Sequence, residues 1–338
     1  MKRLIKSTAV IMLLQLFLQP LFAQVKSSLK LTGTFHIASD GGWDYLSVSP
    51  TKSWLYVSHG TQVNILDKST GDSVGFIPNT TGVHGIAFDP ADGKGFTSNG
   101  RLNTVTVFDL NDNKITGEIK TGENPDAIFY EPFSKKVITC NGRSKDLSII
   151  DPASMKVINT ITLDGKPETA VSDGKGKLFV NIEDKNEIAA VDLSTGKVIS
   201  FWSIAPGEGP TGLAYDNTTQ RLFAGCDDQL IVLNATNGKV VTKVPIGAGC
   251  DGVAFDPTAA MIFTSNGEGT MTAIHEESAD KYTVIENFKT KRGARTICID
   301  PATHKLYLPT ADFDPVQKNE NGRPKMIPGS FQVLVISQ

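Results

Sequence analysis

The sequence lacks the motifs of enzymes that use a nucleophile or a nucleotide. Its 338 residues include four cysteines, with no Cys-x-x-Cys pair, no Gly-x-Ser-x-Gly segment and no glycine-rich phosphate loop. Thiol–disulfide exchange, α/β serine hydrolysis and nucleotide binding therefore have no support. An excess of positive charge is also lacking, because 33 Lys and Arg stand against 36 Asp and Glu. The net charge of −3 argues against nucleic acid as a partner, since phosphate binding needs a basic surface.

Long apolar runs are missing as well, except at the N-terminus. Three basic residues in the first six precede an apolar run at positions 9–18, and Leu21-Phe22-Ala23 follows. This pattern predicts a secretory signal peptide at 1–23, because about ten apolar residues are too few to span a bilayer. The mature chain, 24–338, is then expected to be periplasmic or secreted, monomeric and without a transmembrane segment. Cleavage removes three cations and no anions, which changes the net charge from −3 to −6.

An internal repeat fills the rest of the chain. The segments 85–90, 212–217 and 252–257 read Gly-Ile-Ala-Phe-Asp-Pro, Gly-Leu-Ala-Tyr-Asp-Asn and Gly-Val-Ala-Phe-Asp-Pro. Weaker copies end near residues 50, 132, 174 and 301, so that seven copies follow one another at spacings of 40 to 44 residues. We expect a single repeat domain over 24–338.

Each copy is predicted to form four short strands. Runs rich in β-branched residues, such as Val105–Phe108 and Leu147–Ile150, alternate with Gly- and Asn-containing turns, and no helical apolar period is present. Seven such copies predict an all-β, seven-bladed β-propeller with four-stranded antiparallel blades. The last copy ends on a third strand at 331–336, so residues 29–37 are expected to supply its fourth strand and close the ring.

The second strands and their turns carry a family resemblance. Segments 263–267 and 138–142 read Phe-Thr-Ser-Asn-Gly and Ile-Thr-Cys-Asn-Gly, and Thr-Gly-Lys-type turns follow. In this the chain resembles the YncE-like family of YVTN-repeat propellers over about residues 29–337. The resemblance implies an exported seven-bladed propeller and leaves the ligand open. The fourth copy departs from the pattern, because Ser-Asp-Gly at 172–174 replaces the usual acidic-Pro ending.

Polar side chains at the start of each first strand are the main candidates for a site. These residues differ between blades while their neighbours repeat, which favours contact with a ligand over strand capping alone. The entry positions are Asp44, His84, Asp126, Glu168, Thr211, Asp251 and Arg295. The loops after the second strands add His59, Asn99, Asn141, Glu183, Asp227, Asn266 and Asp312, with Arg101 and Arg143 just beyond. The fold predicts that both sets converge at one mouth of the central channel.

Metal and disulfide chemistry are further options. The carboxylates of Asp44, Asp126, Glu168 and Asp251 offer oxygen ligands suited to Ca²⁺, whereas zinc at His59 and His84 would need a third ligand. Cys226 and Cys250 fall near the same mouth, where an exported protein could join them, the alternative being buried thiols. Cys140 and Cys298 are expected to lie too far apart to bond.

One insertion breaks the repeat. Residues 314–329 separate the second and third strands of the last blade and include Lys318, Arg323 and Lys325. A loop this long is often functional, and we expect an irregular basic lid over the mouth beside Arg295.

These observations lead to three functional hypotheses. The first is an exported, non-enzymatic propeller that binds a small ligand or a partner protein at the channel mouth. The second is a lactonase-type hydrolase with His84, Glu168 and Arg295 as candidates, in which a carboxylate or histidine would activate water and the arginine would stabilise the oxyanion. The third is nucleic-acid binding through Arg101, Arg143 and the lid. The fold alone does not choose among them.

Overall fold

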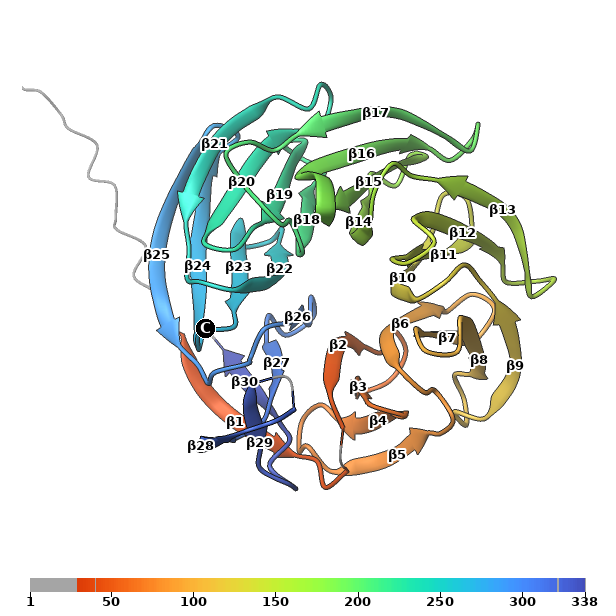
Figure 1. The fold of residues 1–338 in the computed structure, drawn as a ribbon, viewed down its shortest axis with the longest axis vertical. Helices are drawn as coiled ribbons and strands as arrows, with labels where there is room; N and C mark the ends of the chain where they lie inside the picture. Colours follow the sequence, from red (N-terminus) through yellow and green to blue (C-terminus); the bar gives the residue numbers. More distant parts are fainter. Residues whose placement is uncertain (1–28, 40, 321, 338) are drawn as a thin grey trace, which may run out of the picture.

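Seven antiparallel sheets of four strands each form a ring in the computed structural model (Figure 1). It describes residues 29–39, 41–320 and 322–337, so the predicted signal peptide at 1–23 lies outside the described residues. The first strand of each sheet lies nearest the centre of the ring, and the last strand lies at its rim. The predicted seven-bladed propeller is therefore confirmed. Within the described ranges, no helix is long and apolar enough to cross a membrane.

The blades follow the chain in order. Blade one contains β2 (Trp43–Val48), β3 (Trp54–His59), β4 (Gln62–Asp67) and β5 (Ser73–Ile77). Blade two contains β6 (Val83–Asp89), β7 (Lys94–Asn99), β8 (Thr104–Asp109) and β9 (Ile115–Lys120). Blade three contains β10 (Pro125–Glu131), β11 (Lys136–Asn141), β12 (Asp146–Asp151) and β13 (Lys156–Thr162). Blade four contains β14 (Pro167–Ser172), β15 (Lys177–Ile182), β16 (Glu187–Asp192) and β17 (Lys197–Ser203), with the short 3₁₀ helix η1 (Glu183–Lys185) after β15.

The remaining blades complete the ring. Blade five contains β18 (Leu213–Asp216), β19 (Arg221–Gly225), β20 (Gln229–Asn234) and β21 (Val240–Pro245). Blade six contains β22 (Cys250–Asp256), β23 (Met261–Asn266), β24 (Thr270–Ser278) and β25 (Lys281–Lys289). Blade seven is built from β26 (Cys298–Ile299), β27 (Leu306–Thr310), β30 (Gln332–Ser337) and β1 (Lys30–His36).

The turns between third and fourth strands show why the repeat folds this way. In blade one, the carboxylate of Asp67 accepts hydrogen bonds from the backbone N–H groups of Ser69, at 2.8 Å, and Thr70, at 3.1 Å. Gly71 then adopts a φ of +82°, which costs a residue without a Cβ little. The Asp-x-x-Thr-Gly sequence therefore specifies the reversal that pairs β4 with β5.

The hydrophobic core lies between the blades. Tyr56 of blade one is fully buried and contacts Phe108 of blade two, with ring centroids 5.8 Å apart. Val63 and Ile65 of the first blade and Ile86 of the second belong to the same buried cluster. Because neighbouring blades cover both faces of each sheet, the second and third strands are buried on both sides, as β3, β7 and β8 show.

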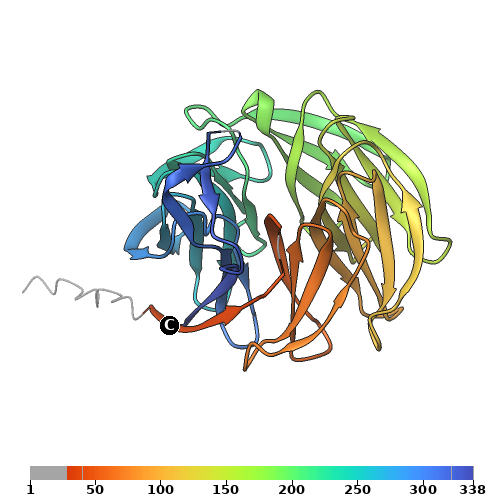
Figure 2. The ribbon, with the colours of Figure 1, turned by 60° about the horizontal axis from the view of Figure 1, so that its bottom comes forward.

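The ring closes between the two ends of the chain. β1 pairs antiparallel with β30 in a register that joins Lys30 to Ser337, and Figure 2 shows β1 running beside the C-terminal strand. The fully buried Phe331 precedes β30 and stacks on Trp43 of blade one, with centroids 5.3 Å apart. The prediction that residues 29–37 complete the last blade is confirmed.

The insertion in blade seven differs from its prediction. It is a β-hairpin instead of an irregular loop, formed by β28 (Phe313–Lys318) and β29 (Pro324–Met326). Asp314 starts it with a turn, because its carboxylate accepts the N–H groups of Val316 and Gln317, each at 2.8 Å. Paired backbone groups give this segment an order that the polar, Pro-containing sequence did not indicate.

Candidate functional site

We call the end of the ring where the first strands begin the entry mouth, and the opposite end the exit mouth. The predicted entry positions do share one mouth, because each lies at or just before the start of its first strand. They separate into two groups of ion pairs. Asp44, His84, Asp126 and Glu168 belong to blades one to four, whereas Asp251 lies in β22 of blade six and Arg295 in the link to blade seven.

Asp44, His84 and Asp126 form the tightest cluster. Nδ1 of His84 lies 2.6 Å from Oδ2 of Asp44 and 3.6 Å from Oδ1 of Asp126. Burial of the imidazole opposes protonation, but the hydrogen bond to Asp44 and the charge of Asp126 outweigh it and raise the pKa of His84 to about 9. The imidazole is thus a cation at neutral pH, held between two carboxylates.

Ionisation of the Asp126 carboxyl group is unfavourable in this position. The group is buried, and its Oδ1 atom has no hydrogen-bond partner. Burial, and then the nearby charge of Asp44, raise the pKa of Asp126 above its ordinary range.

Glu168 shares its side of the mouth with a lysine. Nζ of Lys166 lies 3.1 Å from Oε2 of Glu168 and also pairs with Glu183. Burial and the charge of Asp126 nevertheless raise the pKa of Glu168. Lys166 therefore neutralises the carboxylates of blade four only in part.

Arg295 and Asp251 form an ion pair between blades six and seven. The guanidinium also approaches the carbonyl oxygen of Trp43, at 3.5 Å. Thr211 is the remaining entry residue. Its hydroxyl donates a hydrogen bond to the carbonyl of Cys250 at 2.8 Å and thus connects blade five to blade six.

Tyr45 lies among these charges and was not predicted as part of the site. Its hydroxyl is 3.2 Å from the hydroxyl of Thr169, so it connects β2 to β14, which face each other across the ring in Figure 1. Burial, and then the charges of Asp126 and Glu168, raise the pKa of Tyr45 well above its usual value. The ring of Tyr45 therefore occupies part of the central space below the cluster.

Departures from the repeat could have identified both residues that were missed. The residue after the entry position is small in the other six blades: Gly85, Ala127, Thr169, Gly212, Gly252 and Thr296. Two residues before the entry position, five of the other six links carry glycine and the sixth carries Asn124. Tyr45 and Lys166 are thus exceptions at positions where the repeat is otherwise uniform.

The asparagines at the ends of second strands, which were predicted to face the channel mouth, lie inside their own blades. Asn99, Asn141 and Asn266 are fully buried. Each accepts a hydrogen bond from a threonine two residues earlier, and each donates to hydroxyl groups of the third strand, as Asn99 does to Thr106 at 2.8 Å. Their amides therefore hold the ends of the second and third strands together.

His59 also lies away from His84. Its Nδ1 is 2.6 Å from the hydroxyl of Ser39, its Nε2 is 3.0 Å from the carbonyl oxygen of Gly41, and its ring stacks on Phe331. The structure therefore does not bring the two histidines of the zinc hypothesis together.

The other loop residues also have protein partners. Glu183 pairs with Lys166, the carboxylate of Asp227 accepts the N–H of Gly249 at 3.0 Å, and Asp312 lies 2.7 Å from Nζ of Lys291.

All four cysteines are free thiols. Sγ of Cys226 points to the carbonyl of Ala224 and Sγ of Cys250 to that of Gly252, each within its own strand region. The predicted Cys226–Cys250 disulfide is therefore not formed in this structure. Burial raises the pKa of the Cys226 thiol to about 12 and that of Cys298 to about 11, so both are poor nucleophiles.

A pocket of about 600 Å³ lies between the β28–β29 hairpin and the entry mouth. Its wall carries three guanidinium groups and four apolar side chains: Arg292, Arg295, Arg323, Trp43, Phe313, Pro324 and Met326. Arg295 pairs with Asp251, whereas neither Arg292 nor Arg323 has an ion-pair partner among the described residues. The indole N–H of Trp43 is buried and has no acceptor. The hairpin thus forms one wall of a pocket beside Arg295, and Arg292 and Arg323 also line it.

Comparisons with known proteins give a match in structure only. No protein-family model and no curated protein sequence matches the chain. A solved structure described as Kuenenia stuttgartiensis hydrazine synthase matches with a TM-score of 0.71, covering 81% of this chain and 94% of that chain at 16% identity. The likeness shows the fold alone.

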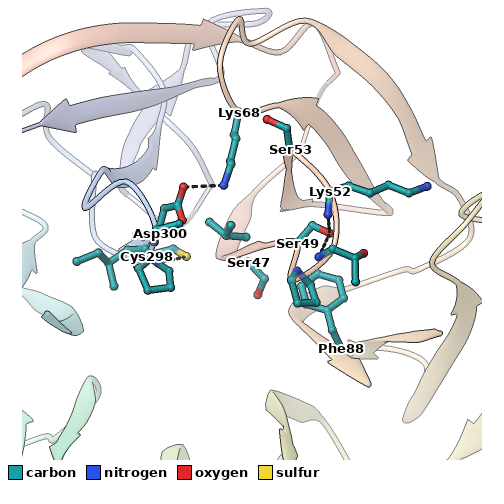
Figure 3. A pocket seen from close by; sticks show the side chains of 14 residues that line it. Ser47, Ser49, Lys52, Ser53, Lys68, Phe88, Cys298 and Asp300 are labelled. Atoms are coloured by element: carbon teal, nitrogen blue, oxygen red, sulfur yellow. Dashed lines mark hydrogen bonds and ion pairs between the residues drawn. The ribbon is translucent and has the colours of Figure 1, made fainter. Parts of the chain in front are cut away.

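The exit mouth has a different character. A second pocket, of about 670 Å³, lies there between blades seven and one (Figure 3). Nζ of Lys68 reaches 2.7 Å from the carboxylate of Asp300, and the hydroxyl of Ser49 accepts the N–H of Lys52. The polar groups labelled in this pocket mostly bond to one another or to their own turns.

The three residues of the hydrolase hypothesis are each held by another group. His84 is bonded to Asp44, Glu168 lies beside Lys166, and Arg295 is paired with Asp251. A protonated imidazole has no free lone pair with which to accept a proton from water, so His84 in this arrangement is not a general base at neutral pH.

Proposed function

We propose that this protein is an exported propeller that binds a small anion with a flat apolar part in the pocket between the β28–β29 hairpin and the entry mouth. The propeller fold is consistent with a binding or scaffold role. The observation that carries the proposal is the pair of guanidinium groups of Arg292 and Arg323, which have no ion-pair partner within the described part of the chain and lie beside the rings of Trp43 and Phe313.

The chemistry of the pocket supports this class of ligand. Guanidinium groups bind carboxylate and phosphate oxygens through parallel N–H donors, and they bind most strongly where water is excluded. The rings of Trp43 and Phe313, with centroids 6.1 Å apart, offer a surface for a flat apolar group. The pocket volume suits a molecule of one or two rings.

The position of the pocket agrees with a binding role. It is formed by a hairpin present in one blade only, and the other six blades have short connections between their second and third strands. Export is part of the proposal and is supported by the N-terminal pattern at 1–23. It predicts that the chain recovered from the periplasm or medium begins at Gln24, which N-terminal sequencing would read directly.

Calorimetry with matched probes tests the ligand class. We expect 2-naphthoate or 2-naphthyl phosphate to bind the mature chain at least tenfold more tightly than 2-naphthamide, which has the same shape and no charge. A preference between the two anions would show whether a carboxylate or a phosphate is favoured. Equal binding of the amide, or no binding of either anion, would overturn the proposal.

Two variants locate the binding. Arg323→Gln should weaken anion binding at least tenfold, because it removes one guanidinium from the pocket wall. Lys318→Gln removes the same charge from the same hairpin but lies outside this pocket, so it should change binding less than twofold. Equal losses in both variants would show attraction by the overall charge of the hairpin and would contradict a site in the pocket.

A further inference from the structure

Three side chains of the kinds that bind metal ions meet at one point of the entry mouth. They come from the first strands of three consecutive blades: Asp44 on β2, His84 on β6 and Asp126 on β10. One carboxylate oxygen from each aspartate and one imidazole nitrogen all lie within 4.8 Å of one another. Each is the second residue of its strand, so the three side chains come together from equivalent positions of neighbouring blades.

An unsatisfied buried atom at this point indicates that the cluster is incomplete. Asp126 is 7% exposed, and its Oδ1 atom has no hydrogen-bond partner. Nδ1 of His84, at 3.6 Å, is beyond hydrogen-bonding distance. A buried carboxylate oxygen without a donor is costly unless a cation completes it. The oxygen faces the two other candidate ligands, so a cation placed among them would satisfy it.

We infer that Asp44, His84 and Asp126 bind one divalent transition-metal ion through Oδ2, Nδ1 and Oδ1, and that Zn²⁺ is a suitable probe for this site. The inference is independent of the anion pocket beneath the hairpin, because it uses none of the residues that line that pocket.

The observed distances fit this assignment with a small adjustment. Ligand atoms of a tetrahedral zinc site lie about 3.3 Å apart, given metal–ligand bonds of about 2.0–2.1 Å. The 3.6 Å between His84 and Asp126 is close to that value, and the 2.6 Å between His84 and Asp44 must widen by ~0.7 Å. A rotation of the two partly exposed side chains, Asp44 and His84, supplies this without moving the strands.

The ligand set favours a transition metal over calcium. Calcium takes six to eight oxygen ligands, whereas one imidazole with two carboxylates suits zinc, manganese or iron. The other two carboxylates of the calcium hypothesis have cationic partners, because Glu168 lies beside Lys166 and Asp251 is paired with Arg295. Three protein ligands leave coordination positions open toward the mouth, as in sites that hold a water molecule or a ligand.

The same chain offers a matched control. His304 and Asp256 form a pair with the same atoms at the same distance, Nδ1 to Oδ2 at 2.6 Å, at the exit mouth. Within the described residues, no second carboxylate lies within ion-pair distance of His304. If substitution of His84 abolishes metal binding and substitution of His304 does not, a histidine–aspartate pair alone is insufficient. The third ligand is then required.

The experiment is a zinc titration of the chelator-treated mature chain by calorimetry, with bound metal measured after gel filtration. We expect one Zn²⁺ per chain, a loss of affinity of at least 100-fold in Asp126→Asn and in His84→Gln, and less than a twofold change in His304→Gln. Far-ultraviolet circular dichroism and a thermal melt of each variant confirm that it is folded. Should Asp126→Asn not fold, Asp44→Asn takes its place, because its side chain lies nearer the surface.

Three outcomes would overturn the inference. The first is no zinc retained by the wild-type chain. The second is undiminished binding in a folded Asp126→Asn or Asp44→Asn variant, which would place the ion elsewhere. The third is an equal loss in His304→Gln, which would show adventitious binding to histidines in general. Binding of Ca²⁺ at least as tight as that of Zn²⁺ would contradict the transition-metal assignment.

Discussion

The two ends of strand β10 carry buried carboxyl groups whose pKa values are shifted in opposite directions. At the exit mouth, Glu131 accepts hydrogen bonds from the backbone N–H of Ser134, at 2.7 Å, and from the hydroxyl of Ser172, at 2.9 Å. Burial alone would raise the pKa of Glu131, but these hydrogen bonds outweigh it and lower the pKa. At the entry mouth, Asp126 has an oxygen without a donor, and burial raises its pKa.

The same contrast extends around the ring. Asp216 and Asp300 end their first strands with carboxylates whose pKa values are lowered by hydrogen bonds that outweigh burial. Glu168 and Asp251 precede or begin first strands at the entry mouth, and burial raises the pKa of each. Ionisation of these exit-mouth carboxylates therefore stabilises the fold, whereas ionisation of these entry-mouth carboxylates destabilises it. Buried charges that cost stability are typical of sites retained for function.

The largest effect is expected from Asp300→Ala. This carboxylate is buried, lies 2.7 Å from Nζ of Lys68 and accepts the hydroxyl of Thr303 at 2.7 Å. Its removal leaves a half-buried lysine unpaired and should lower the free energy of unfolding by about 3 kcal/mol, as measured by urea titration. Asp67→Ala, which removes an exposed turn carboxylate, is the control and should cost clearly less. Equal losses of unfolding free energy in the two variants would mean that a buried carboxylate at the exit mouth stabilises the fold no more than a turn carboxylate does.

A smaller loss, dependent on pH, is expected from Glu131→Gln. At pH 7 the free energy of unfolding should fall by about 1.5 kcal/mol, because charge-assisted hydrogen bonds become neutral ones. The pKa of Glu131 is lower in the folded chain than its ordinary value of 4.5, so its stabilisation is fully present above that pH and is lost on acidification. The difference between variant and wild type should therefore shrink as the pH falls below about 4.5. A difference that is constant between pH 7 and pH 3 would contradict this.

The smallest effect has the opposite sign. Glu168→Gln should raise the free energy of unfolding by about 1 kcal/mol at pH 9, because it removes a buried negative charge next to Asp126. The raised pKa means that ionisation of Glu168 disfavours folding, fully above the folded pKa and not at all below the unfolded one. The gain should therefore disappear near pH 4. Destabilisation by Glu168→Gln at pH 9 would show that both mouths use their charges in the same way.

The fold could be predicted from the sequence because the same strand-and-turn pattern recurs in seven consecutive segments. Seven Gly-x-Ala-x-Asp-Pro-like segments at regular spacing specify seven similar blades, and the absence of a fourth strand after 331–336 indicated the role of 29–37. The entry positions could also be aligned. The hydrogen-bond partners of these side chains could not be predicted. A position in a strand indicates which face of the sheet a residue lies on, but not the group to which its side chain bonds. Asn99 was therefore predicted to face a ligand although it bonds to Thr104 and Thr106.

Residues that break the repeat were harder to interpret than residues that follow it. Lys166 stands where most links have glycine, and its role depends on the charge of Glu183 in the next loop, which alignment alone does not place beside it. The hairpin at 313–326 has no counterpart in the other blades, so nothing in the repeat predicted its strands.

The closure between β1 and β30 has a consequence for the timing of folding. The register joins Lys30 to Ser337, so the first strand of the ring to be synthesised pairs with the last strand of the ring. At about 5–20 residues per second, the ribosome needs on the order of 15–60 s to make the residues between them. Throughout that interval β1 has no partner strand and the seventh blade has no outer edge. The ring can therefore close only after β30 has been synthesised, and the strands made before it must be kept from pairing with other molecules until then.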